Sequence, residues 1–298
     1  MTGPTAVGVD VGATKAMATL VAPDASVLAR EIVETPAADV PGVLQAMHDV
    51  AEAVLDPSAV AIGVGAAGMV ELRTGRMRYA PNIAWRDVDL HQPLAPLGLP
   101  TFIDNDCTTA TFGELVAGAG RGTGHLLYVG VGTGIGGGIV MDGRVQRGAY
   151  GFAGEIGHIV VEPDGPVCGC GNRGCWETVA SGSAVTRLGH ERMGIDGYSV
   201  VDAARHRDAD ALGILRDVGT RLGEGIAGLV NVLDPELVIV GGGAAASAGD
   251  LLLEPARRAF GATVEGAGHR PDVGIVPATL GADGAAVGAA LWALEEVR

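Results

Sequence analysis

Three of the four cysteines of the chain lie close together in a short glycine-rich stretch. Cys168, Cys170 and Cys175 fall within eight positions, and His158 precedes them. Three thiolates and one imidazole fill the tetrahedral shell of a zinc ion and leave no coordination position for water. The glycines between them let the chain turn sharply around an ion. The spacing therefore predicts a structural zinc site, and the alternative is three reduced cysteines in a glycine-rich loop.

Two carboxylates flank this cluster, Glu155 before it and Glu177 after it. A metal that fixes the four ligands also fixes these two side chains. His158 can use one ring nitrogen for zinc and the other for a bound molecule. We therefore expect the metal to hold one wall of a binding pocket.

A second group of chemically capable residues stands near the N-terminus, in a turn between two expected strands: Asp10, Gly12, Thr14 and Lys15. Such a turn offers backbone N–H groups, a hydroxyl and an ammonium to a phosphate, and Asp10 can hold Mg²⁺ through water. The spacing differs from a Walker A loop, and no helix is expected to follow. An ordinary hairpin turn is the alternative interpretation.

The same pattern returns about 120 residues later. The sequence YVGVGTG at 128–134 resembles VGVDVGAT at 7–14, and each stretch is expected to be a strand leading into a glycine-rich hairpin. The repeat predicts a duplicated fold, with Thr14 and Thr133 on opposite sides of one phosphate chain. The GxGxxG matches in the second stretch are weak dinucleotide signals, because a strand rather than a helix follows them.

A third group of polar residues follows a short expected strand at 101–103. Asp104, Asn105 and Asp106 come directly after it, ahead of an expected helix at 108–117. The carboxyl ends of strands in open α/β sheets are where ligands bind. Helix capping is the alternative role for one of the three, since aspartate and asparagine are good caps.

Small residues follow two further expected strands. Gly68 comes after a strand at 59–65, and the glycines 241–243 follow a strand at 237–240. Glycine lets the backbone approach a ligand closely, such as a nucleotide base or ribose, although a plain turn or tight packing explains it as well. For Asn82, a role in a turn is favoured over a ligand contact.

The length of 298 residues suggests two domains. We predict an N-terminal α/β domain at 1–118 and a larger one at 119–283, with a last helix at 284–298 packing back on the first. Hydrophobic periodicity predicts further elements: strands within 5–35 and at 273–276, and helices at 41–55, 199–206, 209–233 and 250–260.

Composition and charge exclude several classes of protein. Apolar residues make up 48% of the chain, and the formal net charge is −15. The negative charge argues against nonspecific binding to nucleic acid or to an anionic membrane, so a bound phosphate must be held locally. The sequence shows neither a basic segment with an apolar stretch at its start nor an apolar run long enough to span a bilayer. We expect a cytoplasmic enzyme with reduced thiols.

In this order, the motifs VGVDVGATK, IDND, VGVGTGIGGG, GEIGH and CGCGNRGCWE resemble the ROK family of sugar kinases, in particular its actinobacterial ATP-dependent glucokinases. The resemblance covers essentially the whole chain. It implies the actin-like ATPase fold, with two duplicated RNase H-like α/β domains closing on a cleft. It also implies transfer of the γ-phosphoryl group of ATP to a hexose 6-hydroxyl, most simply that of glucose, by a homodimer or homotetramer.

The resemblance also implies roles for particular residues. Asp106 corresponds to the catalytic base. The sugar-binding residues would be Gly68, Asn105, Asp106, Glu155, His158 and Glu177. Contacts to the nucleotide and its Mg²⁺ would come from Asp10, Gly12, Thr14, Lys15, Thr133, Gly134, Gly242 and Gly243.

Four departures from the family pattern leave the substrate open. Thr108 stands where relatives carry a second asparagine, and Cys107 replaces a small alanine. The first hairpin reads Val-Gly-Ala-Thr rather than Ile-Gly-Gly-Thr, and the stretch 69–71 ends in glutamate rather than aspartate. Mannose, N-acetylmannosamine, fructose or a C7-cyclitol remain alternative substrates, and polyphosphate an alternative donor. The repressors of the family carry an N-terminal helix-turn-helix. We expect none here, because the phosphate hairpin begins at Asp10 and the charge is acidic.

Overall fold

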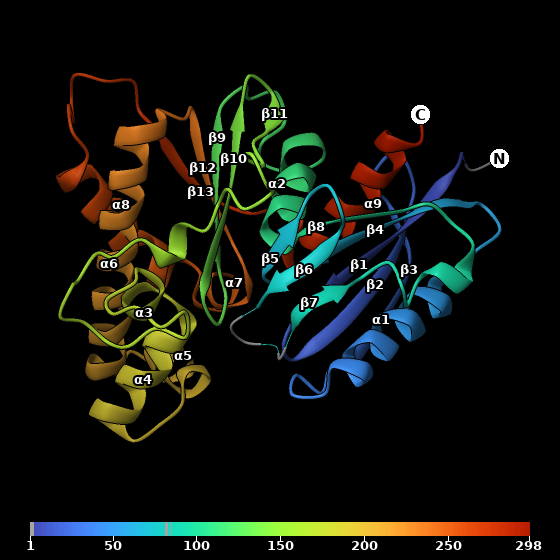
Figure 1. Cartoon of the computed structure of the whole chain (residues 1–298). Helices are drawn as coiled ribbons and strands as arrows, with labels where there is room; N and C mark the ends of the chain where they lie inside the picture. The colour runs from blue at the N-terminus through green and yellow to red at the C-terminus, as the bar shows by residue number, and fades with distance from the viewer. Residues whose placement is uncertain (1–2, 81–82, 84) are drawn as a thin grey trace. The chain divides into compact units, whose positions relative to one another are not determined.

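The computed structural model describes residues 3–80, 83 and 85–298 (Figure 1). By the density of internal contacts, the chain divides into two compact units. Unit 1 comprises Met1–Gly122, Gly138–Gly154 and Thr279–Arg298, and unit 2 comprises Thr123–Gly137 and Glu155–Ala278. Each unit is described by itself. Whether the predicted domains 1–118 and 119–283 fold as such stays a prediction, and Asn82 lies outside the described residues.

Unit 1 is built on a five-stranded sheet with the order β3-β2-β1-β4-β8. β1 pairs antiparallel with β2 and parallel with β4, and β4 pairs parallel with β8. The carboxyl ends of the three parallel strands therefore meet at one edge, where Asp10, Gly65 and Asp104 lie in register. The strands expected in this region are confirmed: β1 (Thr5–Val11), β2 (Lys15–Val21), β3 (Val27–Glu34), β4 (Ala59–Ala66) and β8 (Thr101–Asn105).

Helices cover both faces of this sheet (Figure 1). Alternate residues of β1 point to opposite faces. Val7 and Val9 pack in the core that α1 (Val40–Val54) completes, whereas Ala6 packs against α9 (Gly284–Glu296). A Cβ atom at Gly63 would collide with the carbonyl oxygen of Ala289 in α9. Glycine in the strand therefore lets this helix lie directly on the sheet.

α2 (Asp106–Val116) packs against α9 and ends at a buried carboxylate. Glu114 is 1% exposed, and its oxygens accept hydrogen bonds from the N–H groups of Ala119, Thr279 and Leu280 at 2.8–2.9 Å. The hydroxyl of Thr279 also donates to it, at 3.1 Å. One carboxylate therefore secures both the chain leaving α2 and the segment that leads into α9.

Unit 1 also contains a small antiparallel sheet that the sequence did not predict. It has the order β5-β6-β7, formed by β5 (Met69–Glu71), β6 (Arg76–Tyr79) and β7 (Arg86–Asp89), and η1 (Ala95–Leu97) follows it. Met77 and Trp85 are fully buried in the same core as Val7 and Val9. This sheet therefore extends the core of unit 1.

The second five-stranded sheet repeats the order of the first, as β11-β10-β9-β12-β13. β9 pairs parallel with β12, β12 pairs parallel with β13, and β10 pairs antiparallel with β11. The duplication predicted from the sequence repeat is confirmed by this strand order. The strands are β9 (Leu126–Val131), β10 (Ile135–Met141), β11 (Arg144–Val145), β12 (Leu237–Gly241) and β13 (Gly274–Pro277).

Most of unit 2 outside the sheet is helical. The indole N–H of the buried Trp176 donates to the carbonyl of Arg221 at 2.9 Å, which anchors the end of the cysteine loop on α6. The predicted helices correspond to α5, α6 and α8; α7 was not predicted. The elements are η2 (Ile156–His158), α3 (Glu177–Ala180), α4 (Gly182–Met193), α5 (Gly197–Arg205), α6 (Ala209–Leu233), α7 (Gly243–Ala248), α8 (Asp250–Thr263) and, in unit 1, η3 (Gly281–Asp283).

Membrane-spanning helices are missing from the described part of the chain: each helix there is too short or too polar to cross a bilayer.

Candidate functional site

The predicted polar residues Asp104, Asn105 and Asp106 lie where β8 ends and α2 begins. The strand continues through Asn105, two residues beyond the prediction, and α2 begins at Asp106 rather than at 108. The side chain of Asn105 caps the helix, accepting from the N–H groups of Cys107 and Thr108 at 2.8 and 3.1 Å. Its amide donates to the carbonyl of Gly68 at 3.1 Å, which brings two predicted sugar-binding residues together.

Asp10 and Asp106 are two of the carboxyl groups at this edge of the sheet whose pKa values are raised. Burial, followed by the nearby Asp106, raises the pKa of Asp10 to about 7, against the lowering influence of Lys15. Burial also raises the pKa of Asp106. The N–H of Cys107 donates to the Asp106 carboxylate at 2.9 Å, which partly offsets the rise. A raised pKa makes a carboxylate a better proton acceptor near neutral pH.

The first predicted phosphate hairpin is a tight turn between β1 and β2. The N–H of Gly12 donates to the carbonyl of Lys15 at 3.0 Å. Thr35, directly after β3, holds the turn in place. Its hydroxyl donates to the carbonyl of Gly12 at 2.9 Å, and its N–H donates to the carbonyl of Thr14 at 3.1 Å. Thr14 itself is exposed. The turn is therefore fixed by the backbone while the Thr14 side chain stays accessible.

The second predicted hairpin, in unit 2, is also a tight turn but is one residue shorter. The N–H of Gly132 donates to the carbonyl of Gly134 at 3.0 Å, and the exposed Thr133 lies between them. The first residues of α4 hold this turn, because Gly182 donates to Gly132 at 2.9 Å and Ser183 to Thr133 at 3.2 Å. Each hairpin thus presents a threonine from a rigid turn.

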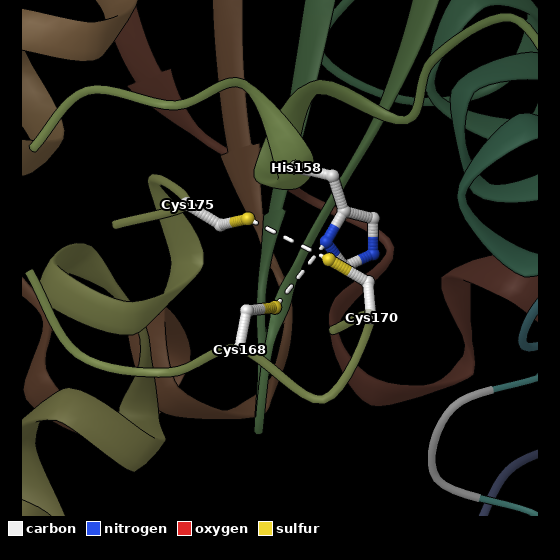
Figure 2. Close-up of side chains that lie close together, drawn as sticks. All are labelled: His158, Cys168, Cys170 and Cys175. Carbon is white, nitrogen blue, oxygen red and sulfur yellow. Dashed lines mark hydrogen bonds between the residues drawn. The ribbon is translucent and has the colours of Figure 1, made fainter. Parts of the chain in front are cut away.

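The predicted metal ligands lie together in unit 2, with their side chains pointing toward one another (Figure 2). One donor atom from each of His158, Cys168, Cys170 and Cys175 lies within 4.8 Å of the other three. Nδ1 of His158 is 3.6 Å from Sγ of Cys168, and the Sγ atoms of Cys170 and Cys175 are also 3.6 Å apart. The cluster therefore joins the end of η2, at His158, to the glycine-rich loop that carries the three cysteines.

The donor set fits a zinc ion. Burial raises the pKa of the Cys168 and Cys175 thiols, so without a cation both are protonated near neutral pH. A bound Zn²⁺ stabilises thiolates and so compensates for this burial. Three sulfur donors and one nitrogen donor match a closed structural site, which supplies folding energy rather than an open position for chemistry.

The two flanking glutamates lie beside this cluster. Oε1 of Glu177 accepts from the Cys168 thiol at 3.0 Å and lies 3.7 Å from Nδ1 of His158. Its Oε2 accepts from the N–H of Ile135 in the second hairpin at 3.3 Å. Oε2 of Glu155 lies 3.8 Å from Nε2 of the same imidazole. Within unit 2, the imidazole therefore stands between the two carboxylates, and Glu177 joins the cluster to the hairpin.

The glycines after β12 begin a short helix. Gly242, with φ of +88°, is the N-cap of α7, and Gly243 is its first residue. A side chain at Gly242 would also meet the backbone of Val131 at the end of β9. Close strand packing and the left-handed conformation both explain this glycine, and the predicted nucleotide contact stays a prediction.

Sequence reasoning missed one charged residue at the candidate site of unit 1. Arg147 follows β11, and its Nε lies 2.5 Å from Oδ2 of the buried Asp104. Burial raises the pKa of Asp104, and the Arg147 cation opposes the rise. Because Arg147 stands alone between glycine-rich segments, no periodicity or motif distinguished it.

Comparison with known proteins places these features in one family. The model of the ROK family matches residues 6–296. The glucokinase of Streptomyces coelicolor is 36% identical over 97% of each chain. A crystal structure of a ROK family glucokinase from Streptomyces griseus in complex with glucose and AMPPNP superposes with a TM-score of 0.91 at 36% identity, covering 98% of this chain and 99% of that one.

A structure of another functional class also matches. A ROK family transcriptional regulator, a homolog of the E. coli MLC protein, gives a TM-score of 0.82 at 26% identity and covers 97% of this chain and 77% of that one. The fold is that of the actin-like ATPases, as the sequence motifs implied. The family match spans nearly the whole length, and this chain therefore belongs to the ROK family.

Proposed function

We propose that this chain, a ROK-type sugar kinase, transfers the γ-phosphoryl group of ATP to the 6-hydroxyl of a hexose, with glucose preferred. The observation that carries the proposal is the match along the whole chain to a glucokinase whose crystal structure holds glucose and AMPPNP. The raised pKa of Asp106 supports it independently, because a phosphoryl acceptor must lose a proton.

Asp106 is the proposed general base. Its carboxylate accepts the proton of the 6-hydroxyl as the oxygen attacks the γ-phosphorus atom. The first turn of α2 orients it: the N–H of Cys107 donates to Asp106, and Asn105 caps the same turn. The pKa raised by burial makes the carboxylate a stronger acceptor than an exposed aspartate. Positioning of this kind is most of what phosphoryl transfer requires from a protein.

The proposed sugar ligands are hydrogen-bond acceptors and donors. Glu155, His158 and Glu177 bind hydroxyl groups, and Asn105 and the backbone at Gly68 bind others. Carboxylates form strong hydrogen bonds with hydroxyl groups. The N–H of Ile135 donates to the carboxylate of Glu177 and so orients it before a sugar arrives.

The nucleotide contacts follow from the two hairpins. The proposed phosphate contacts are backbone and side-chain groups of Gly12, Thr14, Lys15, Thr133 and Gly134, and the start of α7 at Gly242 and Gly243 borders the nucleoside. Asp10 is the proposed contact for the Mg²⁺ of MgATP, which neutralises phosphate charge. Zinc, held by His158 and the three cysteines, keeps the sugar-binding loop in shape.

A sugar-binding regulator is the second candidate function, favoured by the match to the ROK family transcriptional regulator. A regulator binds a sugar without turning it over. The two functions therefore differ in a single observable, phosphorylated product.

Quantification of the phosphorylated acceptor, which forms with either donor, tests the proposal. Glucose, mannose, N-acetylmannosamine, fructose and a C7-cyclitol are compared as acceptors, with ATP or polyphosphate as donor. The proposal predicts the highest kcat/KM for glucose with ATP. Turnover of another acceptor or donor at a higher kcat/KM would reassign the substrate, and hexose binding without any turnover would favour the regulator.

A further inference from the structure

An ion pair in unit 1 joins β8, the strand that leads into the proposed base, to a separate segment of the chain. Nε of Arg147 lies 2.5 Å from Oδ2 of Asp104, whose side chain is 2% exposed while that of Arg147 is 20% exposed. Asp104 stands two residues before Asp106 in the sequence. An ion pair at this depth is held in one geometry far more firmly than an exposed pair.

On the strand side, Asp104 is fixed by several contacts. Its Oδ1 accepts from the N–H of Asn105 at 2.8 Å, and its backbone lies in register with Gly65 of β4. Asn105 in turn caps the helix that begins at Asp106. The carboxylate of Asp104 is therefore part of the hydrogen-bonded turn that sets the direction of the proposed base.

On the other side, Arg147 begins the segment 147–154, which makes its own contacts within unit 1. Its carbonyl accepts from the N–H of Ala153 at 3.2 Å, which closes the segment into a loop. Its guanidinium lies over the ring of Trp292 in α9, 4.8 Å from the ring centroid. The carbonyl of Tyr150 accepts from the N–H of Leu72, just after β5, at 3.0 Å. The residue that follows this segment in the sequence is Glu155.

We propose that Arg147 is a positioning residue for the reaction: through its ion pair with Asp104, it fixes both the turn that presents Asp106 and the loop that ends at Glu155. The inference rests on the proposed function for the roles of Asp106 and Glu155. The pair itself touches no reacting atom. Its loss should therefore displace the base and a sugar ligand together.

This double action gives a distinctive kinetic signature. Loss of the base alone lowers kcat, and loss of a sugar ligand alone raises the hexose KM. Loss of the Asp104–Arg147 pair should change both, by about 10- to 100-fold in kcat/KM, because small displacements of positioned groups cost rates of that order.

The test must separate positioning from stability. In Arg147→Met, the buried Asp104 loses its partner and the protein is destabilised. A loss of activity in this variant could therefore come from lower stability or from lost positioning. The double variant Asp104→Asn/Arg147→Met removes both charges, and the methionine keeps an apolar contact on Trp292. A neutral buried pair costs little stability compared with a broken ion pair. The matched control is the exposed pair Arg192–Asp217, converted to Arg192→Met/Asp217→Asn.

Kinetics, thermal unfolding and hydrogen exchange are measured on the full chain. The proposal predicts that the Asp104→Asn/Arg147→Met variant regains most of the melting temperature lost in Arg147→Met but keeps a lower kcat and a higher hexose KM. It also predicts faster amide exchange in 104–109 and 147–153, with α1 unchanged. The control variant should match the wild type throughout.

Two results would overturn the inference: kinetics restored together with stability, or unchanged exchange in both segments. Failure of the proposed function looks different, because the wild type itself would then phosphorylate none of the hexoses. In that case, the exchange data still decide whether the pair holds the two segments.

Discussion

At the scale of single residues, the candidate site depends on two carboxyl groups at the edge of the first sheet. Asp106 stands at the first position of α2, where the N–H of Cys107 fixes its carboxylate. Asp10 lies one residue before the end of β1, which β4 separates from β8. Asp106 contributes to the raised pKa of Asp10. Asp106 therefore lies close enough to Asp10 to influence its titration. The two groups have different proposed roles, in proton transfer and in binding MgATP.

Replacement of the proposed base should abolish most of the chemistry and leave binding intact. We expect Asp106→Ala to lower kcat by about 100- to 10,000-fold, the usual contribution of a general base. The hexose dissociation constant, measured by calorimetry, should change little, because the other proposed sugar ligands remain. A kcat close to that of the wild type would refute the assignment of the base.

The raised pKa of Asp10 makes the stability of the free protein depend on pH. In the folded state this carboxyl keeps its proton up to about pH 7, whereas an aspartate in the unfolded chain releases it near pH 4. The folded state therefore binds more protons in this window, and the free energy of unfolding should fall as the pH rises from about 4 to about 7. The fall is limited to about 1.4 kcal/mol per pH unit for one group.

Urea unfolding between pH 5 and pH 8, in magnesium-free buffer without nucleotide, measures this dependence. Asp10→Asn has no proton to release at this position, so its unfolding free energy should fall less over the same range. The exposed Asp24→Asn serves as a control that keeps the wild-type slope. Equal slopes for Asp10→Asn and the wild type would show that Asp10 does not titrate in this window.

At the scale of elements, the glycine-rich loop between η2 and α3 depends on the cysteine cluster for its shape. The loop contains little regular structure, and its connections are short backbone hydrogen bonds such as that from Cys168 N–H to the carbonyl of Asn172 at 2.8 Å. A metal held by four side chains would supply the folding energy that the loop otherwise lacks.

We therefore expect Cys170→Ser to bind less zinc, to unfold at a lower temperature and to lose activity together. Elemental analysis of the purified protein gives the metal content, and calorimetry gives the melting temperature. Cys107→Ser changes a cysteine outside the cluster and should keep one zinc per chain. Purified wild-type protein that is active and contains no zinc would contradict the structural role.

The sequence predicted well those elements whose pattern is local. Alternation identified β1 to β3, helical spacing identified α1 and α6, and the spacing of the cysteines identified a cluster that the structure brings together. The start of α2 was predicted two residues late, because Asn105 is both the last residue of β8 and the cap of the helix. A residue with two roles at a boundary has no distinctive pattern in the sequence.

Long-range contacts account for most of what the sequence did not predict. Glu114 looks like an ordinary polar residue near a helix end, yet it is 1% exposed and binds the backbone at Thr279, 165 residues away. Arg147 is equally inconspicuous until the fold places it against Asp104. The small sheet β5-β6-β7 has strands of three or four residues, too short for periodicity to identify.

At the scale of the whole molecule, a duplicated sheet carries the two threonine hairpins. The strand orders β3-β2-β1-β4-β8 and β11-β10-β9-β12-β13 match, so the hairpins occupy equivalent places. One joins β1 to β2 and the other joins β9 to β10. With a net charge of −15, the protein as a whole repels anions. Under the proposed function, local groups such as the backbone of the two hairpins would therefore hold ATP.

The central claim is that this chain transfers a phosphoryl group from ATP to the 6-hydroxyl of a hexose, with Asp106 as the base. The most direct test is ³¹P and ¹³C NMR of the products formed from glucose and MgATP. The account predicts glucose 6-phosphate and ADP in equal amounts with the wild type, and almost none with Asp106→Ala. Phosphate attached at another hydroxyl, or equal product from both proteins, would contradict it.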